Sequence, residues 1–285
     1  MTADNTLMIE DWNGRVGESW RVHQERLDDM LAAYGEAVLG AAGARPGERV
    51  LDVGCGAGAT SLALARAVQP GGAVVGVDVS TPLLERARER AAAAGLDVTF
   101  RCADAGADDL GPGGYDLLVS RFGVMFFADP VAAFVHVRAA ARPGGRLAFV
   151  CWRAAVENEW VVLPQRALRD LVPAPPPPDP AAPGPFSFAA RERVQSILDG
   201  AGFRDVAITP FDAPLRFGRG DTPEAALDDA LAQAADIGPV SRLLAGQPDD
   251  VRARGLAAVR AAFAGRAGPD GVIVRGAAWI VTARA

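Results

Sequence analysis

The stretch VLDVGCGAG, residues 50–58, is a short apolar run that ends in alternating glycines. Its β-branched residues predict a buried strand over Arg49–Val53, and its glycines predict a turn in which a ligand can approach the backbone closely. The residues from Ala59 onward fit a helix, whose first turn offers free N–H groups. This order predicts an α/β domain with a ligand-binding turn after its first strand.

Strand-like and helix-like runs alternate from about residue 49 to residue 151. Such alternation is typical of an α/β domain with a parallel sheet. Helices are expected after Thr81-Pro82 and after Asp129-Pro130, because proline is favoured in the first turn of a helix. Besides the first strand, the expected strands are Ala73–Asp78, Val98–Cys102, Tyr115–Ser120 and Arg146–Cys151.

The flanking segments differ from this pattern. Apolar residues recur at helical spacing between Leu27 and Val38, which predicts one long amphipathic helix before the sheet. Residues 173–185 contain eight prolines in thirteen positions, which predicts an extended connection, either an exposed linker or an edge of the active site. The remaining elements are expected to be a helix over Arg191–Ala201, a strand over Asp205–Pro210, a helical stretch over 222–264 and a strand over Val272–Ala283.

Three parts are expected from this organisation. Residues 1–48 form an N-terminal helical lid segment, and residues 49–152 form the α/β core with the glycine turn. Residues 153–285 contain the proline-rich connection, a small helical cap and the last two strands of the sheet.

The charged residues exclude several classes of function. The 285 residues include 35 acidic and 29 basic side chains, a net charge of -6, whereas a nucleic-acid binder needs a basic surface. All 29 basic residues are arginine, which excludes a phosphate-binding loop, a protein kinase and a pyridoxal-phosphate enzyme, since each depends on a lysine.

Cysteine and histidine are too few and too scattered for a zinc site or a disulfide framework. Cys55, Cys102 and Cys151 form no CxxC pair, and only two histidines accompany them. We therefore expect no metal and a reducing compartment, the cytoplasm. No run of 18 apolar residues and no leader pattern is visible, so we expect no membrane partner. The protein itself is expected to be a monomer or a homodimer.

Three carboxylates near the predicted strand ends suit a nucleotide ligand. Asp78 lies twenty residues after Gly58, where it can accept hydrogen bonds from both ribose hydroxyls or merely cap the next helix. Asp104 could accept from an exocyclic adenine amine or merely stabilise a turn. Asp52, just before the first glycine, suits a cationic group better than a pyrophosphate, and the GxGxG spacing differs from the dinucleotide pattern GxGxxG.

In these features the chain resembles the class I S-adenosylmethionine-dependent methyltransferases. The turn is similar to their motif I, VVGVDVS to their second-strand motif, RCADAGADDL to their adenine-side motif, and YDLLVSRFGVMFFADP and RPGGRLAFVCW to their fourth- and fifth-strand motifs. The similarity is greatest to the quinone-biosynthesis branch, with domains of type 11 or 25, and is strong over residues 49–151. It implies a seven-stranded Rossmann-like sheet of order 3-2-1-4-5-7-6, with strand 7 antiparallel and helices on both faces.

The resemblance also implies S-adenosyl-L-methionine as cofactor and S-adenosyl-L-homocysteine as product. Asp52 would serve the methionine tail, Asp78 the ribose, and Asp104 with the Ala105 backbone the adenine. The segment after the fourth strand lacks the Asn-Pro-Pro-Tyr signature of many enzymes that methylate nucleic-acid amino groups, so a small-molecule acceptor is expected. The full set of expected cofactor-binding residues is Asp52, Gly54, Cys55, Gly56, Gly58, Asp78, Val79, Leu83, Asp104, Ala105, Ser120 and Arg121.

Several side chains near the carboxyl edge of the sheet are candidates for the acceptor pocket. Four tryptophans, Trp12, Trp20, Trp152 and Trp160, could wall a pocket near the sulfonium or could fill the core of the cap. His23, in the N-terminal segment, is either an auxiliary general base or a partly buried structural histidine. The expected pocket residues are Trp12, Trp20, Phe122, Met125 and Trp152.

Three functions remain open from the sequence. The favoured one is an enzyme of class EC 2.1.1.- that transfers a methyl group to an oxygen, nitrogen or carbon of a small molecule, as in specialised or quinone-type metabolism. An NAD(P)-dependent oxidoreductase is an alternative, since it also has a glycine turn and an acid about twenty residues later. A non-catalytic, cofactor-binding regulatory protein is another, because a fold does not determine a function.

Overall fold

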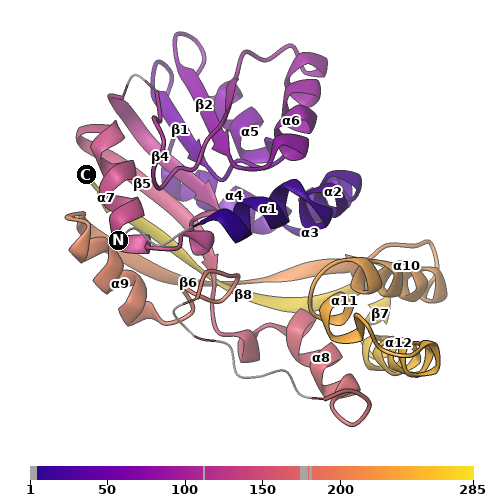
Figure 1. Cartoon of the computed structure of the whole chain (residues 1–285). Helices are drawn as coiled ribbons and strands as arrows, with labels where there is room; N and C mark the ends of the chain where they lie inside the picture. Colours follow the sequence, from indigo (N-terminus) through magenta and orange to yellow (C-terminus); the bar gives the residue numbers. More distant parts are fainter. Residues whose placement is uncertain (1–4, 112, 174–178, 180–181) are drawn as a thin grey trace.

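The computed structural model describes residues 5–111, 113–173, 179 and 182–285, and these contain one mixed β-sheet (Figure 1). The strand order is β3-β2-β1-β4-β5-β8-β6, and the two-residue strand β7 pairs with β8. If β7 is left out and β8 is counted as the seventh strand, this order is 3-2-1-4-5-7-6, which confirms the predicted strand order. β8 runs antiparallel to both β5 and β6, also as predicted.

The five strands from the first half of the chain are parallel, so their carboxyl ends lie on one edge. The chain leaves β1 in one direction for β2 and β3, and then returns to place β4 on the other side of β1. Open α/β sheets bind ligands at such a reversal of strand order. The strands are β1 (Arg49–Val53), β2 (Ala73–Asp78), β3 (Thr99–Cys102), β4 (Tyr115–Arg121), β5 (Ala141–Trp152), β6 (Arg204–Gly218), β7 (Ala267–Gly268) and β8 (Gly271–Arg284).

Helices surround the sheet in Figure 1, and short 3-10 helices follow β4 and β5. The helices are α1 (Thr6–Asn13), α2 (Arg15–Val22), α3 (Gln24–Met30), α4 (Ala32–Ala42), α5 (Ala59–Ala67), α6 (Thr81–Ala93), α7 (Pro130–Ala140), α8 (Glu159–Leu168), α9 (Arg191–Gly200), α10 (Pro223–Asp236), α11 (Pro239–Leu244) and α12 (Asp249–Ala264), with 3-10 helices η1 (Val124–Phe126) and η2 (Ala155–Glu157).

The prediction of one long N-terminal helix is wrong. The segment forms four helices, α1–α4, with breaks at Gly14, His23 and Leu31. The apolar pattern from Leu27 to Val38 continues across the joint at Leu31, because one non-helical residue hardly changes the spacing. Figure 1 shows α1–α3 between the parallel strands and the antiparallel pair of β6 and β8.

β6 is much longer than predicted, whereas β8 exceeds its predicted bounds by one residue at each end, and the two strands extend beyond β5 as an antiparallel pair. β5 ends at Trp152 opposite Ala278, whereas β6 continues to pair with β8 as far as Gly218 and Val272. The part of β6 and β8 beyond β5 is surrounded by four helices, α8, α10, α11 and α12 (Figure 1). We call these helices, together with that part of the two strands, the lobe. The single helical stretch expected over 222–264 is therefore three helices of the lobe.

The residues before and in the first turn of α8 replace β5 where that strand stops. Asn158 Oδ1 accepts a hydrogen bond from the N–H of Ala277 (2.9 Å), and Glu159 Oε2 accepts one from the N–H of Arg275 (2.9 Å). Both side chains are buried. The two side chains satisfy backbone groups of β8 that have no strand partner on that side, and so attach α8 to β8.

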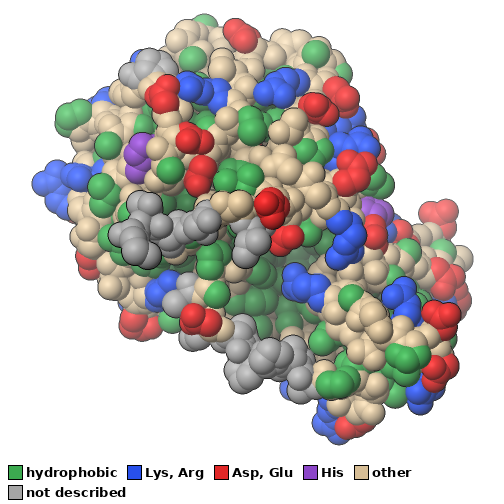
Figure 2. All heavy atoms as spheres, viewed as in Figure 1, with side chains coloured by type: hydrophobic (Ala, Val, Ile, Leu, Met, Phe, Trp, Pro, Cys, Tyr) green, Lys and Arg blue, Asp and Glu red, His purple; other side chains and the backbone are tan. Residues whose placement is uncertain are grey.

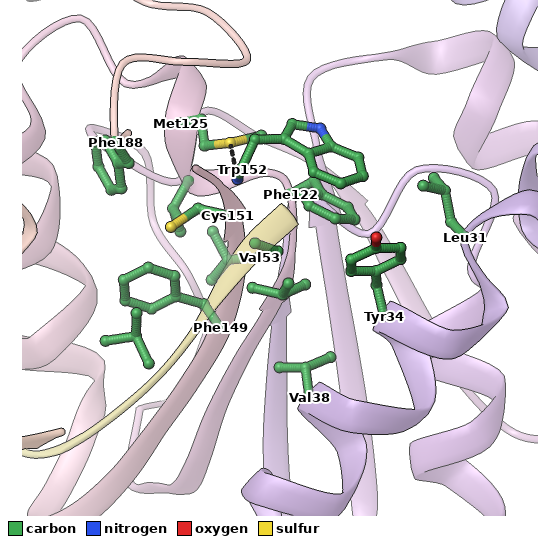
Figure 3. Close-up of a cluster of buried hydrophobic side chains, with 14 of the residues drawn as sticks. Leu31, Tyr34, Val38, Val53, Phe122, Met125, Phe149, Cys151, Trp152 and Phe188 are labelled. Carbon is green, nitrogen blue, oxygen red and sulfur yellow. Dashed lines mark hydrogen bonds between the residues drawn. The ribbon is translucent and has the colours of Figure 1, made fainter. Parts of the chain in front are cut away.

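The hydrophobic core extends along the sheet from the N-terminal helices to the last strand. Figure 3 shows its part beside the carboxyl ends of β4 and β5, where Tyr34 and Val38 of α4 face the strands. Within the described ranges, no helix is long and apolar enough to cross a membrane. In the proline-rich run, residues 174–178 and 180–181 lie outside the described residues, so its extended conformation stays a prediction.

Candidate functional site

The glycine turn begins where β1 ends. The φ angles of Gly54, Gly56 and Gly58 are +66°, +52° and +80°, in the left-handed region that favours glycine. A Cβ on Gly54 would lie 2.7 Å from the Cα of Gly123, so the turn touches the segment after β4 through bare backbone. A Cβ on Gly56 would meet only Leu83 Cδ1, at 3.9 Å, among the described residues. Gly56 therefore has open space on the side from which a ligand can approach.

Asp78, at the end of β2, is hydrogen-bonded to this turn. Its Oδ2 accepts from the N–H of Gly56 (2.8 Å) and its Oδ1 from the N–H of Ser80 (2.9 Å). Burial raises the pKa of this carboxyl group above its ordinary value. The bond to Ser80, directly before α6, resembles the capping alternative, while the bond to Gly56 stabilises the turn. A carboxylate has about four lone-pair positions, so it could still accept from two ribose hydroxyls.

Asp52, inside β1, is fully buried. Its Oδ2 accepts from Ser61 Oγ at 2.6 Å, whereas its buried Oδ1 has no hydrogen-bond partner among the described residues. Burial raises the pKa of Asp52 to about 7, while the bond from Ser61 and the positive charge of Arg121 oppose that rise. A buried carboxylate oxygen without a donor is costly, and an ammonium group would satisfy it.

Asp104 follows β3 and has two roles in the structure. Its Oδ1 accepts from the N–H of Gly106 (2.8 Å), which stabilises a turn. Its Oδ2 accepts from Asn5 Nδ2 (2.9 Å), which holds the start of the N-terminal helices beside the expected adenine position. The neighbouring Ala105 is buried.

Ser120 and Arg121 end β4 beside the turn but contact different parts of the molecule. Ser120 Oγ donates to the carbonyl of Val53 (2.7 Å) and accepts from the N–H of Gly123 (3.2 Å), so it joins the ends of β1 and β4. Arg121 Nη2 donates to Asp28 Oδ1 on α3 at 2.9 Å. The sequence carried no signal for this pair, because ninety-three residues separate its members.

The remaining expected cofactor residues also lie at this edge. Cys55 and Leu83 are buried, and Val79 is half-buried between β2 and α6. Burial is the main reason why the pKa of the Cys55 thiol lies well above its usual value, so this thiol is not a nucleophile at neutral pH.

Helices α1 and α2 lie over the corner between β2 and α6. The side chain of Asn13 donates to the carbonyl of Val79 (2.8 Å) and accepts from the N–H of Thr81 (3.0 Å). Trp12 packs edge-on against both Trp20 and Phe126, with ring centroids 5.5 Å apart in each pair. The structure thus brings the two predicted tryptophans together. Asn13 was missed, since nothing in its neighbours marks a contact with a distant helix.

A second aromatic cluster lies at the carboxyl ends of β4 and β5. Phe122, with a φ of +63°, stacks on Trp152 at a centroid distance of 4.2 Å. A positive φ is uncommon for a bulky residue and persists only where the surroundings hold it. Tyr34 and Trp160 extend the cluster, at 5.0 and 5.5 Å from Trp152. Met125 is buried beside them, and its Sδ accepts from the N–H of Trp152 at 3.4 Å (Figure 3).

Figure 2 shows a hollow lined by hydrophobic side chains in the middle of the view, between the core and the lobe. Phe122 and Trp152, which come from the strand ends of the core, were expected to line an acceptor pocket. Trp160 was among the tryptophans that could wall a pocket, whereas Tyr34 was missed, because only the packing of α4 brings it to the strand ends.

His23 lies at the joint between α2 and α3 and pairs with the lobe. Its Nε2 is 2.6 Å from Asp236 Oδ2, at the end of α10. A surface cavity of about 450 Å³ surrounds it, lined by Arg21, Val22, His23, Gln24, Glu25, Arg26, Arg86 and Arg219. The structure does not bring His23 into either aromatic cluster. Its role as an auxiliary base therefore stays a prediction.

The residues at this edge fit S-adenosylmethionine. Asp52 offers an unpartnered buried oxygen to an ammonium group, and Gly56 leaves room for a ligand at the backbone. Asp78 and Asp104 place further carboxylates after the neighbouring strands β2 and β3. A pyrophosphate would fit less well, since two carboxylates, the buried Asp52 and the half-buried Asp78, flank the turn. When bound, the cofactor supplies an electrophilic methyl group on a sulfonium.

Comparisons with known proteins agree with this geometry. The profile of the family described as "Methyltransferase domain" matches residues 50–145. Nocamycin O-methyltransferase of Saccharothrix syringae is 34% identical over 182 residues, which cover 60% of this chain and 65% of that protein. Uncharacterised proteins of Mycobacterium tuberculosis are 36% identical over 125 residues, and the chain spans only 44% of their length.

Two solved structures share the fold over nearly the whole chain. YcgJ of Bacillus subtilis has a TM-score of 0.57 at 19% identity, with 89% of this chain and 98% of that chain covered. The [4+2]-cyclase SpnF has a TM-score of 0.55 at 21% identity, with 95% of each chain covered. The family profile covers the glycine turn, Asp78 and Asp104, and the observed strand order is the one expected for this fold. Residues 50–145 are therefore similar to the family described as "Methyltransferase domain", and the chain as a whole shares the fold of these solved structures.

Proposed function

We propose that the protein binds S-adenosylmethionine at the glycine turn and transfers its methyl group to a small-molecule acceptor. The observation that carries this proposal is the unpartnered, buried Oδ1 of Asp52, which lies two residues before a glycine turn in which Gly56 leaves open space. A cofactor with an ammonium group on its tail supplies the donor that this oxygen needs. A nicotinamide dinucleotide would instead bring a pyrophosphate to the same carboxylate.

In this proposal three carboxylates bind different parts of the cofactor. Asp52 binds the ammonium group of the tail, Asp78 the ribose hydroxyls, and Asp104 with the backbone of Ala105 the adenine. Residues 1–48 would act as a lid, 49–152 as the cofactor-binding core, and 153–285 as the cap that completes the sheet and shapes the acceptor pocket. The free cysteines support a reducing compartment, so we place the protein in the cytoplasm.

The acceptor would lie against the aromatic cluster around Phe122 and Trp152. Aromatic walls favour an apolar or planar molecule and stabilise positive charge near the sulfonium. The similarity to an enzyme named as an O-methyltransferase supports an oxygen acceptor. Holding acceptor, methyl carbon and sulfur in line can contribute about 7–11 kcal/mol, so a base such as His23 would act only where the acceptor must lose a proton.

Calorimetric titration tests the proposal. We expect S-adenosylmethionine and S-adenosylhomocysteine to bind and NADH not to bind. A panel of phenols, enols and amines should then include acceptors that release S-adenosylhomocysteine. Binding of NADH alone would favour the oxidoreductase and would overturn the proposal.

A second function is favoured by one observation. SpnF, which shares the fold over 95% of this chain, is named as a [4+2]-cyclase. A protein of this fold can therefore have a non-methylating activity, and binding of S-adenosylhomocysteine alone does not distinguish the two. Conversion of a substrate to product without release of S-adenosylhomocysteine would support this second function.

A further inference from the structure

A cavity of about 700 Å³ lies in the lobe, between α8 and the part of β6 and β8 beyond β5. Its walls carry one arginine from each of four segments: Arg153 directly after β5, Arg166 in α8, Arg266 directly before β7 and Arg275 in β8. Its described lining includes no residue of the glycine turn or of either aromatic cluster. The volume suits a small molecule, since ligand sites commonly enclose about 300–1,000 Å³.

The cavity lies on the face of β6 and β8 that α4 does not cover. Asp212 pairs with Ala277 across the two strands, and both residues line the cavity, as does Arg275. Paired residues point to the same face of a sheet, and successive residues along a strand alternate between faces. A Cβ on Gly276 would lie 2.3 Å from Tyr34 Oη, so the position between Arg275 and Ala277 faces α4. The two strands therefore separate this cavity from the aromatic cluster.

Positive charge is in excess in this cavity. Its lining includes three carboxylates, those of Glu157, Glu159 and Asp212, against the four guanidinium groups. One positive charge is thus without a counter-charge among the lining residues, although the chain as a whole has a net charge of -6. A local excess of positive charge on an acidic protein favours the binding of an anion.

Two of the arginines have N–H donors without a partner. The guanidinium group of Arg166 is exposed and forms no hydrogen bond or ion pair with another described residue. Arg153 donates from Nη1 to Asp212 at 2.8 Å and from Nη2 to Glu157, whereas its buried Nε has no partner within the described ranges. The planar fork of a guanidinium group matches the oxygens of a carboxylate or a phosphate.

The other two arginines share one acid. Glu159 Oε1 accepts from Arg266 Nη2 at 2.6 Å and from Arg275 Nε at 3.0 Å, while its Oε2 accepts from the backbone N–H of Arg275. The side chains of Arg266 and Arg275 are 43% and 82% exposed. Both guanidinium groups can therefore also reach an anion from solvent.

Apolar side chains line the rest of the cavity. Val162 and Leu163 come from the same helix as Arg166, and Val156 lies in η2, before that helix. Val156 is 82% exposed, although a large apolar side chain is usually covered. A ligand with an apolar body would cover Val156 while its charged end lies near the arginines.

We propose that this cavity binds a small amphipathic anion, which carries a carboxylate or a phosphate monoester on an apolar body. Arg166 and Arg275 bind the anionic group, and Val156 contacts the apolar body. The inference does not rest on the proposed function, because the cavity and the glycine turn have no residue in common.

Calorimetric titration with octanoate and octyl phosphate tests the proposal, with octanol and inorganic phosphate as reference probes. We expect at least one of the two amphipathic anions to bind at least about tenfold more tightly than both reference probes. The tighter of octanoate and octyl phosphate then identifies the anionic group as a carboxylate or a phosphate.

Two variants and a matched control place the bound anion. Arg166→Gln and Arg275→Gln should each weaken the binding of the preferred anion about tenfold. Both side chains are exposed, so the melting temperature should stay close to that of wild type. Arg169→Gln is the control, because Arg169 is 73% exposed and three residues after Arg166 but does not line the cavity. It removes the same charge and should change the affinity by less than about twofold.

Three results would overturn the inference. The first is that neither amphipathic anion binds, and the second is that octanol or inorganic phosphate binds as tightly as they do, which would indicate a greasy surface or an adventitious ion only. The third is equal weakening by Arg166→Gln and Arg169→Gln, which would reduce the effect to the overall charge of the protein. Failure of S-adenosylmethionine to bind would overturn the proposed function and leave this inference standing.

Discussion

At the scale of single residues, Asp52 combines full burial with one carboxylate oxygen that has no partner among the described residues. Its pKa is raised by burial from 3.8 to about 7. The ionised form should bind the ammonium group of the cofactor, so affinity should rise with pH and level off above about pH 7. Titrations of S-adenosylmethionine between about pH 5.5 and 8.5 measure this, and Asp52→Asn should remove the dependence.

The same raised pKa predicts how Asp52 affects stability without cofactor. Because its pKa in the folded protein is above the unfolded value, its contribution to the free energy of unfolding is fully present below about pH 4 and is lost as the pH rises through about 7. Between about pH 4 and pH 7, the free energy of unfolding measured in urea should therefore fall less in Asp52→Asn than in wild type. Parallel profiles for the two proteins would argue that Asp52 does not titrate in this range.

Besides the helix-capping role that the sequence left open, Asp78 stabilises the glycine turn through Gly56, which its spacing in the sequence did not indicate. Asp78→Ala removes the acceptor of the N–H groups of Gly56 and Ser80, at a cost of about 1–3 kcal/mol for each buried group left unsatisfied. We expect a lower melting temperature without ligand and at least about tenfold weaker S-adenosylmethionine binding. Asp78→Asn, which keeps one acceptor oxygen, should recover part of the stability but little of the affinity. Wild-type affinity in Asp78→Ala would remove the ribose assignment.

At this scale the sequence located the acids and glycines but not the contacts between distant segments. Asp52, Asp78 and Asp104 could be found because each is tied to a strand end by short-range spacing. Asp28, Asn13 and Tyr34 could not be found, since each meets the site only through tertiary packing.

At the scale of elements, α1 and α2 lie beside the proposed cofactor site. Asn5 binds Asp104, Asn13 binds the start of α6, and Trp12 packs on Phe126 of η1. S-adenosylhomocysteine should therefore slow hydrogen exchange in residues 6–22 and leave α12, on the far side of the lobe, unchanged. Equal exchange of residues 6–22 with and without ligand would reduce these helices to a scaffold.

The attachment of α8 to β8 depends on Asn158. Besides accepting from the N–H of Ala277, its side chain donates to the carbonyl of Ala277 at 3.3 Å and accepts from Trp160 Nε1 at 3.1 Å. Asn158→Ala should lower the free energy of unfolding by about 2–3 kcal/mol, because buried backbone groups lose their partners. Gln165→Ala, at an exposed position of the same helix, is the control and should change it by less than about 0.5 kcal/mol. A similar loss in both variants would show that Asn158 has no special role.

At the scale of the whole molecule, the sheet was predictable and the lobe was not. The alternation of strands and helices and the resemblance of the motifs were enough for the strand order, because parallel strands with crossover helices allow few topologies. The extension of β6 and β8 beyond Trp152 depends on Asn158 and Glu159 replacing β5, and no local pattern marks such a replacement. For the same reason the aromatic cluster that joins α4, β5 and α8 could not be assembled from sequence.

We infer that the turn over Gly54–Gly58 is the cofactor site, and a crystal structure with S-adenosylhomocysteine tests this placement. We expect ligand density at the carboxyl edge of β1 and β2, with the amino group at Asp52 Oδ1, the ribose at Asp78 and the adenine beside Asp104. Density for the ligand at any other place, with the turn left empty at saturating concentration, would contradict it.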